Sequence, residues 1–170
     1  MEITYKIIDQ NTQDLTYLDD ICNLMDKIKN ANASPYLYPP DREFFIKTCK
    51  ESFLTVLAFD KDKLVGYKVI KFLEKWPGYL GEIKGFDVEK STMFLFIIVD
   101  TDYRGYKIGQ KMNQIGLDEI VKTNRTDAFT TVHPDNIANI KNATKLGFVE
   151  LERRELFEEK LLRCILHRTT

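Results

Sequence analysis

The sequence lacks the segments that mark several large classes of protein. No apolar run approaches the ~18 residues of a membrane-spanning helix, and residues 1–6 have neither the basic start nor the apolar stretch of a secretory signal. The three cysteines, Cys22, Cys49 and Cys164, have no paired or metal-ligand spacing, which predicts reduced thiols. We therefore expect a cytoplasmic protein without a metal site.

Neither sign of charge dominates. The 170 residues include 25 lysines and arginines and 26 aspartates and glutamates, for a formal net charge of −1. This balance argues against nucleic acid or an anionic membrane as the main partner. The sequence also has no repeat, low-complexity tract or linker, so we expect one domain over residues 1–170.

Residues 93–110 carry the strongest functional signal. Residues 92–99 are almost all apolar, β-branched or aromatic, which predicts a strand buried on both faces. The turn Asp100-Thr101-Asp102-Tyr103 follows, and apolar residues then recur at helical intervals over residues 107–123. The order is therefore strand, turn and helix.

The start of this helix is suited to bind phosphate. The first amide N–H groups of a helix have no partner within it, and they lie at the positive end of its dipole. Gly105 and Gly109 would let a ligand approach those amides, while Arg104 and Lys107 add positive charge. A pyrophosphate would be held there mainly by backbone donors.

Two better-known phosphate loops do not fit the segment. A P-loop closes with Gly-Lys-Ser/Thr, whereas Gln110 follows Gly109 here. A dinucleotide-binding turn needs three glycines spaced G-x-G-x-x-G after an early strand, and this segment has two. Taken alone, the segment could also contain an ordinary turn glycine followed by a helix-packing glycine.

A second segment strengthens the functional interpretation. Residues 128–132 predict another strand, Pro134 suits a helix start, and Asp135 or Asn136 can cap that helix. Gly147 is the expected left-handed terminator.

Together these residues resemble the Gcn5-related N-acetyltransferase (GNAT) superfamily. Arg104-Gly105-Tyr106-Lys107-Ile108-Gly109 is similar to its acetyl-CoA motif, Arg/Gln-x-x-Gly-x-Gly/Ala between strand and helix. Asn136 and the ending Lys145-Leu146-Gly147-Phe148 match the segment that follows. This second segment looks most like the branch that includes ribosomal-protein and other protein N-terminal acetyltransferases.

The resemblance implies an α/β GNAT-like fold with a mixed, mostly antiparallel central sheet flanked by helices. It implies an acetyl-CoA-dependent N-acetyltransferase that acts without a metal and transfers the acetyl group directly to a primary amine of a small molecule or a protein. A homodimer is one option. The implied cofactor-binding residues lie at the end of the central strand, in the loop and helix start, and at one asparagine: Ile97, Ile98, Val99, Arg104, Gly105, Tyr106, Lys107, Ile108, Gly109, Gln110 and Asn136.

Two positions depart from the family pattern. Lys107 stands where the middle glycine is usual, so the loop has one glycine fewer and one cation more. Ala143 stands where many members have the tyrosine that protonates the departing thiolate. A positioned acid contributes about 10²- to 10⁴-fold, but a thiol with a pKa of roughly 8.5 is a tolerable leaving group without one.

The general base has several candidates. Glu82 and Asp87, in the segment before the central strand, could accept the amine proton, or they could be solvated loop acids. His133 could serve as a base or have a structural role. The aromatic residues Tyr36, Tyr38, Phe44 and Phe45 could form the floor of the acceptor pocket or pack under a Pro-rich loop.

The remaining elements are predicted from periodicity and turn residues. We expect a basic, solvated strand face over residues 61–71 and a long irregular segment around Trp76, as a binding lid or a mobile loop. The other predicted elements are a strand over 3–8, helices over 15–29 and from the Asp41 cap to 50, a loop over 31–40, and hairpins of 53–59 with 64–73 and of 148–155 with 160–167.

Two other functions remain open from the sequence. A non-catalytic acetyl-CoA-binding sensor or interaction module would explain Ala143 and the lack of an obvious base. An acyltransferase could also use a longer acyl-CoA.

Overall fold

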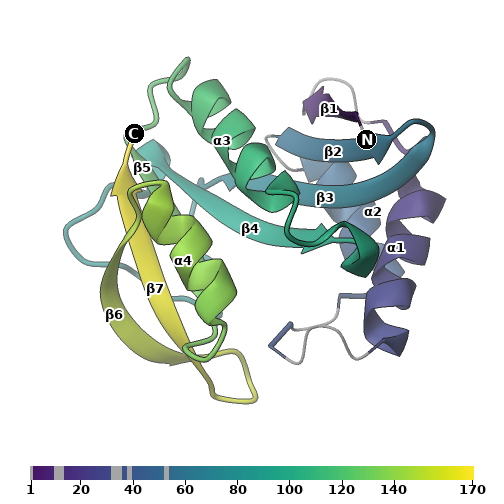
Figure 1. The fold of residues 1–170 in the computed structure, drawn as a ribbon. Coiled ribbons are helices and arrows are strands. Elements are labelled where there is room, and N and C mark those ends of the chain that lie inside the picture. Colours follow the sequence, from purple (N-terminus) through teal and green to yellow (C-terminus); the bar gives the residue numbers. More distant parts are fainter. Residues whose placement is uncertain (1, 10–13, 32–35, 38–39, 52–53) are drawn as a thin grey trace. The chain divides into compact units, whose positions relative to one another are not determined.

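The computed structural model describes residues 2–9, 14–31, 36–37, 40–51 and 54–170 (Figure 1). Tyr38 of the predicted aromatic cluster, residues 32–35 and 38–39 of the predicted loop, and residue 53 of the predicted hairpin lie outside these residues. The strands are β1 (Ile3–Asp9), β2 (Leu54–Asp60), β3 (Lys63–Phe72), β4 (Ser91–Val99), β5 (Asp127–Val132), β6 (Val149–Leu156) and β7 (Leu161–Thr169). The helices are α1 (Leu18–Asn30), α2 (Arg42–Glu51), α3 (Ile108–Ile120) and α4 (Ile137–Lys145), with short 3-10 turns η1 (Val88–Lys90) and η2 (Thr101–Tyr103).

The strands hydrogen-bond in the order β1-β2-β3-β4-β5-β7-β6. Strand β4 pairs with β5 in parallel, whereas the ladders β1·β2, β2·β3, β5·β7 and β6·β7 are antiparallel. The mixed, mostly antiparallel sheet with flanking helices is thus confirmed.

The chain divides into two compact units. The first unit contains Met1–Ile70 and Phe96–Gly116, and the second contains Lys71–Leu95 and Leu117–Thr170. Strands β3 and β4 therefore contribute residues to both units.

In the first unit, helices lie on both faces of the strands. Adjacent residues of a strand point to opposite faces, and Gly66 and Tyr67 of β3 illustrate this. A Cβ atom on Gly66 would come within 2.9 Å of Met112 in α3, so the glycine permits close packing of that helix. The Tyr67 ring packs against Phe45 of α2 with a centroid distance of 5.6 Å.

The second unit has its own apolar core. Leu73, Leu80, Met93, Phe129 and Ile165 belong to one buried cluster. Trp76, in the predicted irregular segment, packs against this core, and its ring lies edge-on to Phe129 at a centroid distance of 5.7 Å. The segment is therefore packed in the structure.

Helix ends follow the predicted capping residues. The Asp41 side chain accepts a hydrogen bond from the Phe44 amide at 2.8 Å, and Asn136 accepts one from the Asn139 amide at 3.2 Å. Gly147 ends α4 with φ +84°, a conformation that favours glycine. The helix predicted over residues 107–123 is shorter in the structure, where α3 runs from Ile108 to Ile120.

The predicted solvated face over residues 61–71 is wrong at Lys68. This side chain is 2% exposed, and burial lowers its pKa to about 7. Strand β3 is buried from Leu64 to Ile70. When a strand is covered on both faces, its residues do not alternate between buried and exposed.

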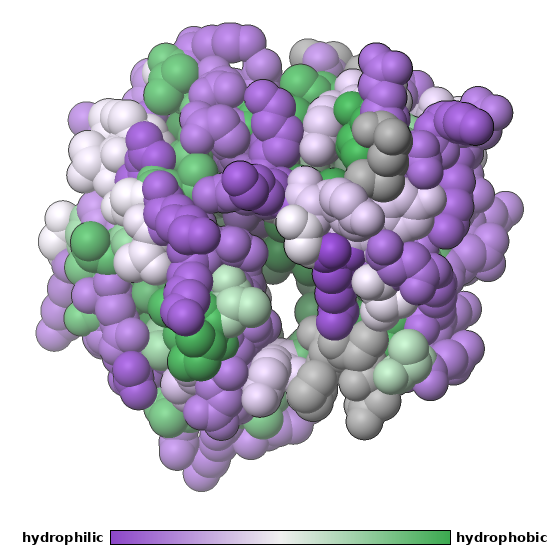
Figure 2. Space-filling model, in the orientation of Figure 1, coloured by the Kyte–Doolittle hydropathy of each residue, from purple (hydrophilic) through white to green (hydrophobic). Residues whose placement is uncertain are grey.

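Hydrophilic side chains dominate the face of the molecule drawn in Figure 2, with hydrophobic residues in small groups. Scattered exposed apolar residues of this kind are normal for a folded domain. Among the described helices, none has the length and apolar character needed to cross a membrane.

Candidate active site

The central strand changes its pairing partway along its length. In the β4·β5 ladder, Ser91–Met93 face Asp127–Phe129 in register. At the next residue the Phe94 carbonyl accepts a hydrogen bond from the side-chain hydroxyl of Thr130 at 3.0 Å. A hydrogen bond from the Thr130 side chain thus follows the last backbone pair of this ladder, while β4 continues to Val99.

The end of β4 enters a tightly held turn in the first unit. The Asp100 amide donates to the Val65 carbonyl of β3 at 2.8 Å. The Asp100 carboxylate, 1% exposed, accepts from the Asp102 amide at 3.1 Å and caps η2. The turn therefore has a fixed start.

The loop over residues 104–107 then lies exposed. Gly105 has φ +86°, and a Cβ there would meet nothing within 4 Å. Lys107 has φ +62°, although left-handed backbone is rare for residues other than glycine. The GNAT motif that this segment resembles has glycine at this position, and glycine adopts such a backbone conformation without strain.

Helix α3 begins against the end of β4. The Lys107 carbonyl accepts from the Lys111 amide at 2.9 Å, and Ile108 is buried. A Cβ on Gly109 would lie 3.4 Å from Ile97 and 3.5 Å from Val99. Gly109 thus faces the strand, as the helix-packing explanation for this glycine expects.

Most of the predicted cofactor residues lie in the first unit, at the end of β4 and, after the turn at η2, in the loop and first turn of α3. Arg104, Gly105, Tyr106 and Lys107 are exposed, and Gln110 is partly exposed. The first-turn amides of α3 follow this exposed, basic loop. Such an arrangement can hold an anionic group.

Asn136 lies at the start of α4 and Ala143 within it, both in the second unit. The side-chain oxygen of Asn136 caps the helix, and its side-chain NH2 group carries two further donors. Ala143 is 5% exposed, and its carbonyl accepts from the amides of Leu146 and Phe148. A methyl group at this position cannot donate a proton.

The three candidate bases have exposed or structural positions in the second unit. Asp87 caps η1 by accepting from the Glu89 amide at 3.0 Å, and Glu82 is exposed. The Nδ1 atom of His133 accepts from the Asp135 amide at 3.1 Å, which favours its structural explanation. Glu82 and Asp87 stay predictions.

The predicted aromatic cluster is partly a packing cluster. The rings of Phe44 and Phe45 lie 5.8 and 6.0 Å from Phe96 of β4, centroid to centroid.

Within the described part of the chain, no group of three or more His, Cys, Asp or Glu side chains could hold a metal ion.

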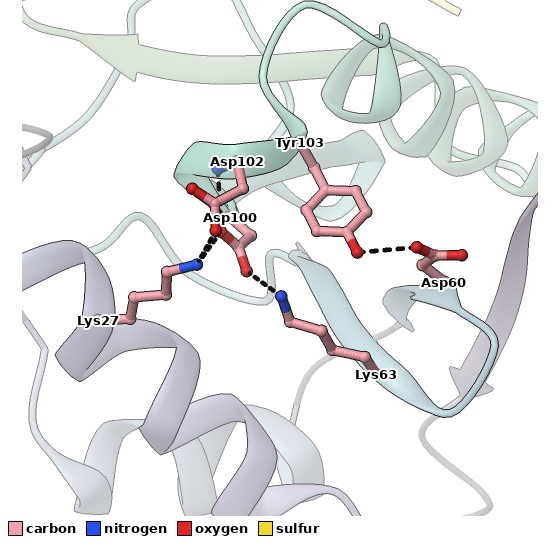
Figure 3. Close-up of polar contacts among 6 residues, drawn as sticks. All are labelled: Lys27, Asp60, Lys63, Asp100, Asp102 and Tyr103. Carbon is pink, nitrogen blue, oxygen red and sulfur yellow. Dashed lines mark hydrogen bonds and ion pairs between the residues drawn. The ribbon is translucent and has the colours of Figure 1, made fainter. Parts of the chain in front are cut away.

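Sequence reasoning missed an ion cluster beneath the turn. Figure 3 shows Lys27 of α1 and Lys63 of β3 directed at Asp100, and Tyr103 directed at Asp60. Burial alone would raise the pKa of Asp100, but hydrogen bonds from Lys27 and the Asp102 amide, together with the positive charge of Lys63, lower it. Lys27 and Asp100 are 73 residues apart, so no local pattern could link them.

A family of known proteins matches most of the sequence. The "Acetyltransferase (GNAT) family" matches residues 18–148. Among curated proteins, none matches the sequence.

Several solved structures share the fold at low sequence identity. The ribosomal-protein-S18-alanine N-acetyltransferase from Escherichia coli has a TM-score of 0.72 and 15% identity, over 99% of this chain and 94% of that chain. The yncA protein from Salmonella typhimurium, with its cofactor acetyl-CoA, has a TM-score of 0.73 and 12% identity, over 99% and 94%. Ard1 from Thermoplasma volcanium has a TM-score of 0.73 and 14% identity, over 100% and 99%. At these identities the likeness establishes the fold alone.

Proposed function

The chain belongs to the acetyltransferase (GNAT) family, and from this membership we propose that it transfers the acetyl group of acetyl-CoA directly to a primary amine. Acyl-CoA-dependent N-acetyl transfer is the activity of the family, and acetyl-CoA is its cosubstrate. The acceptor and the direct attack are the parts that we propose.

One observation carries the proposal. The exposed loop over residues 104–107 takes left-handed backbone at Gly105 and Lys107 and leads into the first turn of α3. Its amides, with the positive end of the helix dipole, are suited to hold a pyrophosphate. Arg104 and Lys107 would add attraction that salt can screen.

The remaining residues support the transfer step. The amine nitrogen attacks the thioester carbonyl, the C–N bond forms, the C–S bond breaks and CoA leaves as its thiolate, while the amine proton passes to a base. Backbone groups at Ile97–Val99 of β4 would orient the thioester, and an N–H aimed at the developing oxyanion can contribute about 2.7 to 4 kcal/mol. Asn136 would bind the pantetheine arm through its amide group.

Proton transfer has fewer candidates. Because Ala143 has no proton to donate, the thiolate would leave unassisted or through water. Glu82 or Asp87 would act directly or through an ordered water as the base. Turnover would then be slow but measurable on the right amine.

We propose the class of acceptor from the proteins to which this chain is similar. The Escherichia coli neighbour acts on the alanine of a ribosomal protein, as its name says, so a protein N-terminal amine is one acceptor to test. A small-molecule amine is the other. The cytoplasmic location and the homodimer stay predictions.

The cofactor site can be tested by a single change of charge. Gln110→Glu places a carboxylate in the first turn of α3, where it favours the helix but repels a pyrophosphate. Gln114→Glu adds the same charge one turn later and is the matched control. We expect calorimetry to show CoA affinity lowered about tenfold in Gln110→Glu, or about 1.4 kcal/mol, and little changed in Gln114→Glu.

Equal CoA affinity in both variants would contradict the assignment of the pyrophosphate to this helix start. A second measurement addresses the reaction itself. The purified protein is incubated with acetyl-CoA and a panel of N-terminal peptides and small amines while free thiol is followed. Thiol release that depends on an amine would support the transfer, and its absence for every amine would leave the proposal without an acceptor.

A further inference from the structure

An ion cluster anchors the turn that precedes the phosphate-binding loop. Its members come from four parts of the first unit: α1, the end of β2, the start of β3 and η2 (Figure 3). The Lys27 Nζ atom lies 2.6 Å from Asp100 Oδ1 and 2.6 Å from Asp102 Oδ2. Lys63 Nζ lies 3.1 Å from the second oxygen, Asp100 Oδ2.

Asp100 is the centre of this cluster. Its side chain is 1% exposed, whereas those of Lys27 and Lys63 are 39% and 53% exposed. A buried carboxylate needs counter-charges and hydrogen bonds to remain ionised. Two lysines supply the charge, and the Asp102 amide supplies a hydrogen bond.

A second contact holds the other end of the turn. The Tyr103 hydroxyl donates to Asp60 at 2.8 Å, and Lys63 Nζ lies 4.9 Å from the centre of the Tyr103 ring. The β2–β3 hairpin thus contacts both Asp100 and Tyr103. Only residues 104–107 separate Tyr103 from the first residue of α3, so the turn fixes where the loop begins.

We propose that Lys27, Lys63 and Asp100 are positioning residues for the acetyl-CoA loop. They hold η2 in the orientation from which the loop amides project, and the two lysines offset carboxylates that would otherwise repel the CoA phosphates. This inference rests on the proposed cofactor site. None of the three residues needs to touch CoA.

The electrostatic part has a direct consequence for Asp102. Its carboxylate is 68% exposed, two residues before the basic loop, and Lys27 is its partner. When Lys27 is removed, Asp102 keeps its charge but loses the lysine that offsets it. Salt screens exposed charges over distances of about 10 Å at 0.1 M, so this repulsion should be strongest at low ionic strength.

The test measures CoA affinity in a set of variants. Lys27→Met removes the charge and keeps most of the side-chain stem. Lys29→Met is the matched control, because Lys29 lies in the same last turn of α1 and contacts the Pro40 carbonyl instead. Lys63→Met is the second variant, and melting temperatures identify any protein that has lost its fold.

We expect Lys27→Met to weaken CoA binding roughly tenfold at low salt and less at high salt. Lys63→Met should act in the same direction, and Lys29→Met should bind as the wild type does. Adding Asp102→Asn to Lys27→Met should restore part of the affinity, because the uncompensated charge is then gone. Loosened packing alone would give neither the salt dependence nor this rescue.

Two results would separate this inference from the proposed function. If wild type binds CoA and Gln110→Glu weakens it, but Lys27→Met and Lys63→Met bind like Lys29→Met, the cofactor site stands and the positioning role is overturned. If wild type does not bind CoA, both proposals are overturned. If Lys27→Met fails to fold, Lys63→Met compared with Lys29→Met decides by its CoA affinity and the salt dependence of that affinity.

Discussion

Lys107 has a backbone conformation that favours glycine, although it carries a long side chain. Its φ of +62° places Cβ close to the backbone, at a cost of roughly 1–2 kcal/mol for an ordinary residue. The same residue adds a cation to the proposed phosphate loop. Its two effects, strain and attraction, can be separated by substitution.

We predict that Lys107→Gly keeps CoA binding but makes it less sensitive to salt. The substitution relieves the left-handed strain while it removes one charge. Lys160→Gly, at φ +51° in the β6–β7 turn, is the control for the backbone effect alone. Calorimetry over a range of salt concentrations gives the slope, and an unchanged slope would mean that Lys107 does not contact a phosphate.

The burial of Lys68 leads to a prediction about how the free energy of unfolding depends on pH. Burial lowers its pKa to about 7, whereas a lysine in the unfolded chain titrates near pKa ~10.4. Between these values the unfolded state binds a proton that the folded state does not. The free energy of unfolding should therefore rise with pH, by about 1.4 kcal/mol per pH unit for this one group.

Urea denaturation between about pH 7 and pH 10 measures this contribution as a difference between proteins. Lys68→Met should remove the rise, and Lys71→Met on the same strand should keep it because Lys68 is still present. Burial raises the pKa of the Cys49 and Cys164 thiols, which acts in the opposite sense but equally in all three proteins. Parallel curves for wild type and Lys68→Met would contradict the prediction.

At the level of elements, one arginine holds the long segment before β4. Arg125 Nη1 donates to the carbonyls of Leu73 at 2.6 Å, Ser91 at 3.0 Å and Val88 at 3.3 Å. Its guanidinium also lies 4.6 Å from the centre of the Phe72 ring. These contacts hold both ends of the segment between β3 and β4, in which Trp76 packs against the core of the second unit.

We predict that Arg125→Met loosens this segment. Three carbonyls lose a charged donor, and hydrogen bonds to charged groups are worth about 1.5–3 kcal/mol, so the loss of stability should be of that order. Hydrogen exchange measured by mass spectrometry should show lower protection over residues 73–90. Arg153→Met, which removes an exposed ion pair with Glu150, is the control and should change little.

Local signals predicted the elements well, and distant contacts explain what they missed. The caps at Asp41 and Asn136 and the terminator Gly147 are readable because their partners lie within a few residues. Lys68 follows two residues of β3, Gly66 and Tyr67, that pack against α3 and α2, and the local sequence does not reveal that this strand is covered on both faces. The loop motif is continuous in sequence, and so it was predicted, whereas its anchor at Lys27 could not be found without the fold.

At the level of the whole molecule, the chain passes between the two units three times. Strands β3 and β4 each run through both units, so neither unit is a continuous piece of chain. Breaking one unit must disturb hydrogen-bonded strands that the other also uses. This connectivity favours one cooperative domain over residues 1–170.

We therefore predict a single unfolding transition. The chain has one tryptophan, Trp76, and it packs against the core of the second unit, so its fluorescence reports that unit. Far-ultraviolet circular dichroism reports the helices of both. In urea the two signals should give the same midpoint and the same slope, as expected for a two-state domain. A fluorescence midpoint clearly apart from the dichroism midpoint would instead mean that the second unit unfolds independently, and that the strands shared by the two units do not couple them.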